Sequence, residues 1–188
     1  MPTPAQAIGT YIQAKDGNRP CLMRQAFVDD AVLDMVVKTD AISFPASASG
    51  LHAITDVLIR RFVQDYENVY TFCLAPPPHA RVDRFSCRWL VGMSSRSTGE
   101  VRVGCGQYDW QFRAASDGLV ERLRITIEQM HIFAPAHLGA IMGWLDELPY
   151  PWCSAAEAAK NMPALPELAR IGAGIAQTKG PAGVSAGP

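Results

Sequence analysis

The hydrophobic pattern of this chain changes its period near residue 68, and that change constrains the fold more than any other feature. Before it, apolar residues recur every three or four positions, as on one face of an amphipathic helix. After it, apolar and polar residues alternate, as in half-buried strands. The alternating segments cover residues 68–74, 83–93, 100–113 and 119–133. This order predicts an α+β domain in which helices precede a four-stranded antiparallel meander, rather than alternating βαβ units.

Three helices are predicted before the meander. The first spans residues 4–15 and ends at Gly17, and the second spans residues 20–30. The third follows Ser49, whose side chain can cap its first turn. Between the second and third helices, residues 32–44 predict two short strands or a hairpin.

The C-terminal part predicts two further helices and a tail. Pro135 begins one helix, and Ser154 with Glu157 forms the capping-box pattern of the other. Residues 173–188 are rich in Gly, Ala and Pro, a composition typical of disorder. We therefore predict a single domain over residues 1–172 and a disordered tail over residues 173–188.

Charge and motif content narrow the function classes. The 188 residues carry a formal net charge of −1, without the basic field expected of a nucleic-acid or membrane-surface protein. No apolar run approaches the ~20 residues of a membrane span, and no secretion signal is visible. The five cysteines include no CxxC pair, which favours a reduced, cytoplasmic protein without a metal site. Neither HExxH, a phosphate loop nor a nucleophile elbow is present, so no cofactor is expected.

Strand alternation predicts which side chains face a concave pocket beneath the helices. Gly104 and Gly106 share one strand face with large aromatics, where they either leave room or allow close backbone approach. His131 shares the parity of the apolar residues Leu123, Ile125 and Ile127, so we expect it at the pocket mouth. The aromatic side chains either fill the core or line a ligand pocket. The candidate ligand-binding residues are Asn68, Trp89, Tyr108 and Trp110, with Tyr70 on the parity of Asn68.

The opposite sheet face mixes apolar and charged side chains. A broad face of this kind often pairs with a second copy, so we predict a homodimer through it. The alternative is that its charges simply contact solvent. The residues on this face are Arg88, Leu90, Val103, Cys105, Arg122, Arg124 and Thr126.

The stretches AFVDDAVL, SGLHAITDVL and GQYDWQFRAASDG resemble the SnoaL-like branch of the nuclear transport factor 2-like superfamily. The resemblance covers residues 5–133. It implies a cone-shaped fold in which N-terminal helices pack on a strongly curved antiparallel sheet, followed here by a C-terminal helical extension. The superfamily includes dehydratases, isomerases, cyclases, dioxygenase β subunits and proteins without catalysis, so the resemblance implies a pocket rather than one reaction.

Within that branch, AKDGNRPCLMRQAF is most similar to the scytalone dehydratase and dehydrochlorinase group. In that group an acid at the end of the first helix orients a histidine that moves a proton, and Asp16 falls on the acid. Asn68 occupies the position of the group's base histidine. The group's second histidine corresponds to a position near Gly104 or Gly106 in this chain. Because an Asn amide does not accept a proton at neutral pH, the group's mechanism does not carry over intact.

Three interpretations of Asp16 follow. Its carboxylate contacts water, or it forms a catalytic set with His131 or Tyr70, or it anchors a ligand without proton transfer. One corresponding function is a cofactor-free lyase (dehydratase) or isomerase acting on a small hydrophobic molecule, with Asp16, Tyr70 and His131 as catalytic residues. The alternative is a non-catalytic binding or assembly module, such as a dioxygenase β-subunit-like partner.

Overall fold

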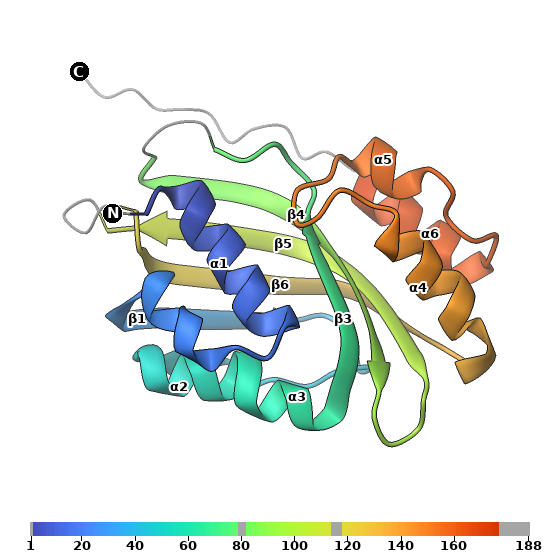
Figure 1. Ribbon diagram of the computed structural model, residues 1–188, viewed down its shortest axis with the longest axis horizontal. Coiled ribbons are helices and arrows are strands. Elements are labelled where there is room, and N and C mark those ends of the chain that lie inside the picture. Colours follow the sequence, from blue (N-terminus) through green and yellow to red (C-terminus); the bar gives the residue numbers. More distant parts are fainter. Residues whose placement is uncertain (1, 79–81, 114–117, 177–188) are drawn as a thin grey trace.

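The computed structural model describes residues 2–78, 82–113 and 118–176. A six-stranded sheet with the order β2-β1-β6-β5-β4-β3 forms its centre (Figure 1). The strands are β1 (Phe27–Val37), β2 (Ser47–Ser49), β3 (Tyr66–Cys73), β4 (Arg84–Ser95), β5 (Val101–Phe112) and β6 (Val120–Phe133). The α-helices are α1 (Pro4–Asp16), α2 (Leu51–Thr55), α3 (Phe62–Asp65), α4 (Leu138–Asp146), α5 (Ala155–Ala159) and α6 (Pro166–Ala176), with 3₁₀-helices at Pro20–Gln25 and Pro135–His137 and a π-helical segment at Asp56–Arg61.

The predicted meander is confirmed, because β3, β4, β5 and β6 pair antiparallel in sequence order. The prediction for the segment before it is wrong. Residues 27–37 form the single strand β1, where we expected a helix end followed by a hairpin. β1 pairs parallel with β6, so the sheet is mixed and not purely antiparallel. A partner strand that lies about ninety positions away leaves no local signal in β1, and this explains the error.

Helices cover both faces of the sheet. In Figure 1, α1, α2 and α3 lie in front of the sheet, while α4, α5 and α6 gather at its right-hand end. We call the face under α1 the inner face; it presents Trp89, Tyr108 and Ile125 to the first hydrophobic core. The outer face presents Leu90 and Val103 to a second core formed with α4 and α6. The fold is therefore three-layered wherever the C-terminal helices reach.

This arrangement corrects the expected dimer surface. Leu90, Val103 and Cys105 are fully buried beneath the chain's own C-terminal helices. Other residues of the outer face, including Arg122 and Arg124, are exposed and remain open to a second copy. A homodimer stays a prediction, and these three residues cannot form its interface while the helices are docked.

Local sequence signals account for the ends of several helices. α1 begins at a capping box formed by Thr3 and Gln6 and ends before Gly17, as predicted. The predicted capping box of Ser154 and Glu157 is confirmed at the start of α5. α6 continues to Ala176, past the predicted boundary at residue 172, and residues 177–188 of the expected tail lie outside the described residues. None of the helices described here has the length and apolar character needed to cross a membrane.

The segment between α4 and α5 covers the free edge of β3. The Cys73 amide donates to the Pro151 carbonyl at 2.7 Å, and the Cys153 amide donates to the Cys73 carbonyl at 3.0 Å. Trp152 forms a parallel bridge with Cys73, and its ring packs edge-on against Phe85. Sheet edges offer unpaired backbone groups, and this edge segment, residues 150–153, satisfies those of Cys73.

Candidate functional site

A cavity lies between the second half of α1 and the inner face of the sheet. Its volume, counted as the space open to the centres of water-sized molecules, is about 50 Å³. A single water needs roughly 10–15 Å³ of such space. Apart from five residues, every lining side chain is an aliphatic, Met or Phe side chain. The five are Tyr11, Lys15, Thr71, Trp89 and Tyr108. The cavity is therefore apolar, with hydrogen-bonding groups from α1, β3, β4 and β5.

A second cavity adjoins the main one. It offers about 270 Å³ to water-sized molecules and shares Ile42, Phe44 and Phe62 with the main cavity. The rings of Phe44 and Phe62 stack at a centroid distance of 6.5 Å. A ligand larger than the main cavity would therefore extend past this pair into the second cavity, whose polar lining includes Arg61 and Asp65.

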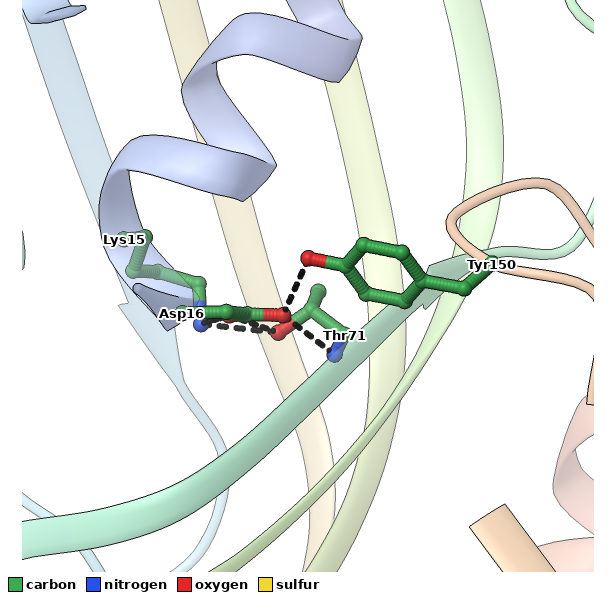
Figure 2. Close-up of polar contacts among 4 residues, drawn as sticks. All are labelled: Lys15, Asp16, Thr71 and Tyr150. Carbon is green, nitrogen blue, oxygen red and sulfur yellow. Dashed lines mark hydrogen bonds and ion pairs between the residues drawn. The ribbon is translucent and has the colours of Figure 1, made fainter. Parts of the chain in front are cut away.

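Asp16 lies at the polar end of the main cavity, and its side chain is only 6% exposed. Figure 2 shows how residues from three parts of the chain converge on its carboxylate. Oδ2 accepts from the Thr71 amide at 2.7 Å and from the Tyr150 hydroxyl at 3.0 Å. Oδ1 accepts from Lys15 Nζ at 2.7 Å and from Thr71 Oγ1 at 2.9 Å. The interpretation of Asp16 as a solvated residue is therefore wrong.

Lys15 is the residue that the network presents to the cavity. Its side chain is 8% exposed, and Nζ donates to Asp16 and to Thr71 Oγ1, each at 2.7 Å. Nζ also lies 5.1 Å from the centroid of the Phe62 ring, a cation–π distance. An ammonium group has three N–H donors, and within the described residues only two have acceptors.

Lys15 is not among the site residues predicted from the sequence, although a signal for it exists. Ile8, Tyr11 and Ile12 form the buried stripe of α1, and Lys15 continues that stripe at the i+3, i+4 and i+7 positions. A lysine on an apolar helix face needs a buried partner, and Asp16 with Thr71 supplies it.

Buried aromatic donors surround the deep end of the cavity. Tyr11 is fully buried between Phe27, Tyr108 and Trp110, at ring distances of 5.7, 6.3 and 5.5 Å. The hydroxyl of Tyr11 and the indole N–H groups of Trp89 and Trp110 have no hydrogen-bond acceptor in the part of the chain that the structure describes. Burial raises the pKa of Tyr11 and of Tyr108, so both phenols stay protonated at neutral pH. These groups can donate to an oxygen and cannot serve as bases.

Comparison with known proteins identifies the architecture. Neither a family model nor a curated protein matches the sequence. Among solved structures, an NTF2-like protein from Burkholderia thailandensis is 16% identical, with a TM-score of 0.52 over 68% of this chain and 92% of that one. The chain has the nuclear transport factor 2-like (NTF2-like) fold. At this level of identity the similarity establishes the NTF2-like fold and not an activity.

Two further NTF2-like neighbours have bound or designed ligands. A computationally designed 17-OHP binder is 15% identical, with a TM-score of 0.53 over 70% of this chain and 99% of that one. A protein with a ketosteroid isomerase-like fold from Catenulispora acidiphila, in complex with trimethylamine, is 15% identical, with a TM-score of 0.50 over 66% of this chain and 85% of that one. The shared part is close in length to α1–β6, which span residues 4–133.

The NTF2-like sheet places Tyr70 away from Asp16, contrary to expectation. Asn68 has a left-handed backbone (φ 52°), and the register of β3 with β4 shifts between Glu67 and Tyr70. As a result Tyr70 packs toward the outer core, and Thr71 faces the cavity in its place. The Tyr70 hydroxyl donates to Asp146 Oδ1 of α4 at 2.8 Å, and this bond raises the pKa of Tyr70. Asn68 itself donates to Ser94 Oγ at 2.9 Å.

The predicted alternation is also wrong at the end of β6. Opposite Cys105 and Gly106, the register shifts and Glu128 becomes an extra residue. Met130 therefore lines the cavity together with Ile125 and Ile127, and His131, opposite Val103, does not. Within the described lining of the main cavity there is thus no Asp, Glu or His side chain. No cluster of three potential metal ligands occurs among the described residues.

The remaining expected residues lie at or beside the cavity. Trp89 and Tyr108 line it, and Trp110 packs behind Tyr11. Gly104 and Gly106 allow neighbouring atoms to approach β5 closely. A Cβ atom at Gly106 would lie 2.7 Å from the Trp89 ring and would collide with the Thr126 carbonyl, so Gly106 lets the indole and the neighbouring strand lie against β5.

Proposed function

We propose that the protein binds a small, largely apolar molecule that carries a carbonyl oxygen, with its apolar part in the main cavity and its oxygen hydrogen-bonded to Lys15. One observation carries this proposal: a buried ammonium group, held by Asp16 and Thr71, has its remaining N–H donor at the wall of an otherwise apolar cavity. Pockets of this composition are the usual sites for small ligands.

The charge balance favours a neutral acceptor over an anion. Lys15 and Asp16 form an ion pair with an N–O distance of 2.7 Å, so together they carry no net charge. A ligand carboxylate would be repelled by Asp16 in a poorly solvated site, whereas a carbonyl oxygen accepts the N–H without adding charge. A hydrogen bond to a charged donor contributes about 1.5–3 kcal/mol.

Matched ligand pairs test the proposal. Acetophenone and α-methylstyrene have nearly the same shape and differ in a carbonyl oxygen replaced by a methylene group, and 2-butanone with 2-methyl-1-butene forms a smaller pair. Affinities would be measured by NMR titration for the wild type and for Lys15→Met/Asp16→Asn, which removes both buried charges together. We expect the ketone-to-alkene affinity ratio to fall in the double variant by about tenfold to a hundredfold, the equivalent of the lost hydrogen bond.

The control is Lys160→Met, which removes an exposed lysine on the same chain. Its affinity ratio should equal that of the wild type. The proposal is wrong if neither ligand pair binds, or if the double variant keeps the wild-type ratio.

A cofactor-free isomerase or lyase is the second candidate, because an ammonium donor that polarises a carbonyl makes the adjacent C–H groups more acidic. Such an enzyme also needs a base. Asp16 already accepts four hydrogen bonds, and the described lining of the main cavity supplies no other carboxylate and no imidazole; Asp65 lines only the second cavity. We therefore expect no protein-dependent deuterium incorporation into the methyl group of acetophenone in D₂O. Measurable incorporation that disappears in Lys15→Met/Asp16→Asn would favour the enzyme.

A further inference from the structure

Tyr150 lies in the edge segment and reaches the polar end of the cavity from the far side of the sheet. Its ring contacts Phe72 and Tyr70 edge-on, at centroid distances of 5.8 and 6.4 Å. The backbone hydrogen bonds of Pro151 and Cys153 to Cys73 fix the segment directly after Tyr150. Figure 2 shows the phenol extending from the edge segment toward the end of α1, where its oxygen meets Asp16.

The contact joins two parts of the chain that are 134 positions apart. Tyr150 donates to Asp16 Oδ2 at 3.0 Å, and Asp16 Oδ1 accepts from Lys15 at 2.7 Å. Although 42% of Tyr150 is exposed, desolvation of its hydroxyl, followed by the charge of Asp16, raises the pKa of Tyr150, so the hydroxyl stays a donor across the neutral range. Asp16 thereby connects Tyr150, which lies between α4 and α5, to the Lys15 ammonium group that faces the cavity.

We propose that Tyr150 is a positioning residue of the ligand site: by occupying Asp16 Oδ2, it keeps the third N–H of Lys15 available to the ligand, so that the C-terminal extension sets the cavity's preference for carbonyl compounds. This inference rests on the proposed function. It assigns to the extension a role in ligand selection in addition to covering the outer face.

The physical reason is a competition for one donor. Oδ2 has the Thr71 amide and the Tyr150 hydroxyl as its two donors. Without the hydroxyl, Oδ2 keeps the Thr71 amide and loses its second donor, which leaves a charged oxygen with an open acceptor position beside Lys15. Such an acceptor attracts the nearest available N–H, because leaving it unsatisfied is costly. The donor that the ligand needs would then turn toward the protein.

The experiment compares two single hydroxyl deletions. Tyr150→Phe removes the bond to Asp16, and Tyr70→Phe removes a bond of 2.8 Å from a neighbouring phenol to Asp146, outside the network. Both variants keep their aromatic rings and the ring contacts. For Tyr150→Phe we expect the acetophenone-to-α-methylstyrene affinity ratio to fall by about threefold to tenfold, with the alkene affinity unchanged within about twofold. For Tyr70→Phe both affinities should match the wild type.

The affinity for the alkene distinguishes a loss of Lys15 positioning from a general loosening of the cavity. A variant that merely loosens the cavity changes the affinity for both ligands, whereas loss of Lys15 positioning changes only that for the ketone. The inference is overturned if Tyr150→Phe keeps the wild-type ratio, or if Tyr70→Phe lowers that ratio equally. If the wild-type ratio already equals that of Lys15→Met/Asp16→Asn, the proposed function itself fails.

Discussion

The two faces of the sheet both bury aromatic side chains, but they treat the polar atoms of those side chains differently. On the outer side, the Trp144 indole donates to the Ala158 carbonyl at 3.0 Å, and the Tyr70 hydroxyl donates to Asp146 at 2.8 Å. On the inner side, Tyr11 and Trp89 line a cavity, and the Tyr11 hydroxyl and the Trp89 indole N–H are buried without an acceptor among the described residues. These two aromatic donors of the outer side are satisfied within the protein, whereas the two of the inner side are not among the described residues.

That difference separates packing from binding. A buried donor without an acceptor costs about 1–3 kcal/mol, so folded proteins keep few of them. Here such donors gather beside a cavity that also receives the free N–H of Lys15. The outer side, where the extension closes over Leu90 and Val103, stabilises the fold. The inner side keeps the Tyr11 and Trp89 donors without acceptors among the described residues, and it is the side to which the proposed function assigns the ligand.

The largest expected effect concerns the polar end of the inner side. Asp16→Ala leaves the Lys15 ammonium buried without its counter-charge and should lower the free energy of unfolding by about 3–5 kcal/mol. Lys15→Met/Asp16→Asn removes both charges and should cost much less. Urea unfolding of both variants measures the difference. Equal losses would show that the two residues do not act as a buried pair.

An effect of intermediate size is expected from adding one methylene group, because the change in stability should differ between the two faces. Val103 is fully buried in the outer core, so Val103→Ile should overpack it and lower the free energy of unfolding by about 1–3 kcal/mol. Val91 lines the cavity, where the extra methylene of Val91→Ile has room; stability should stay unchanged or rise by up to about 0.8 kcal/mol. Thermal or urea unfolding provides the comparison. Destabilisation of the same size at both sites would contradict the contrast between the faces.

The smallest effect concerns a single hydroxyl. Because the Tyr11 hydroxyl has no acceptor in hydrogen-bond geometry among the described residues, Tyr11→Phe removes no hydrogen bond seen there and should change the free energy of unfolding by less than about 0.5 kcal/mol, or raise it. Equilibrium unfolding in urea, compared with the wild type under the same conditions, measures the change. A loss greater than about 1 kcal/mol would mean that the hydroxyl is bonded, with Tyr108 as its nearest phenol neighbour.

Periodic and local signals in the sequence sufficed for much of the fold. The alternating segments predicted the meander, and the Ser154–Glu157 pattern predicted the start of α5. Asp16 was singled out through the resemblance, in which it falls on the acid that ends the first helix, and it does have partners in Lys15 and Thr71. β1 was missed because parallel pairing with β6 is a long-range contact, and Asp29 with Asp30 imitates a helix end.

The partners of Asp16 could not be predicted from alternation alone. One irregularity at Asn68 and one at Glu128 each shift a strand by a residue, which turns Tyr70 and His131 away from the cavity. Tyr150 lies in a loop far along the chain, and only the docking of the C-terminal helices brings it to α1. Lys15 was overlooked because a lysine beside an aspartate at a helix end usually lies in solvent.

A crystal structure of the protein with acetophenone tests the central claim most directly. The account predicts the ring in the main cavity and the carbonyl oxygen about 2.7–3.2 Å from Lys15 Nζ, with Asp16 still bound to Thr71 and Tyr150. A ligand whose carbonyl points away from Lys15, or a cavity that stays empty at saturating ligand, would contradict it.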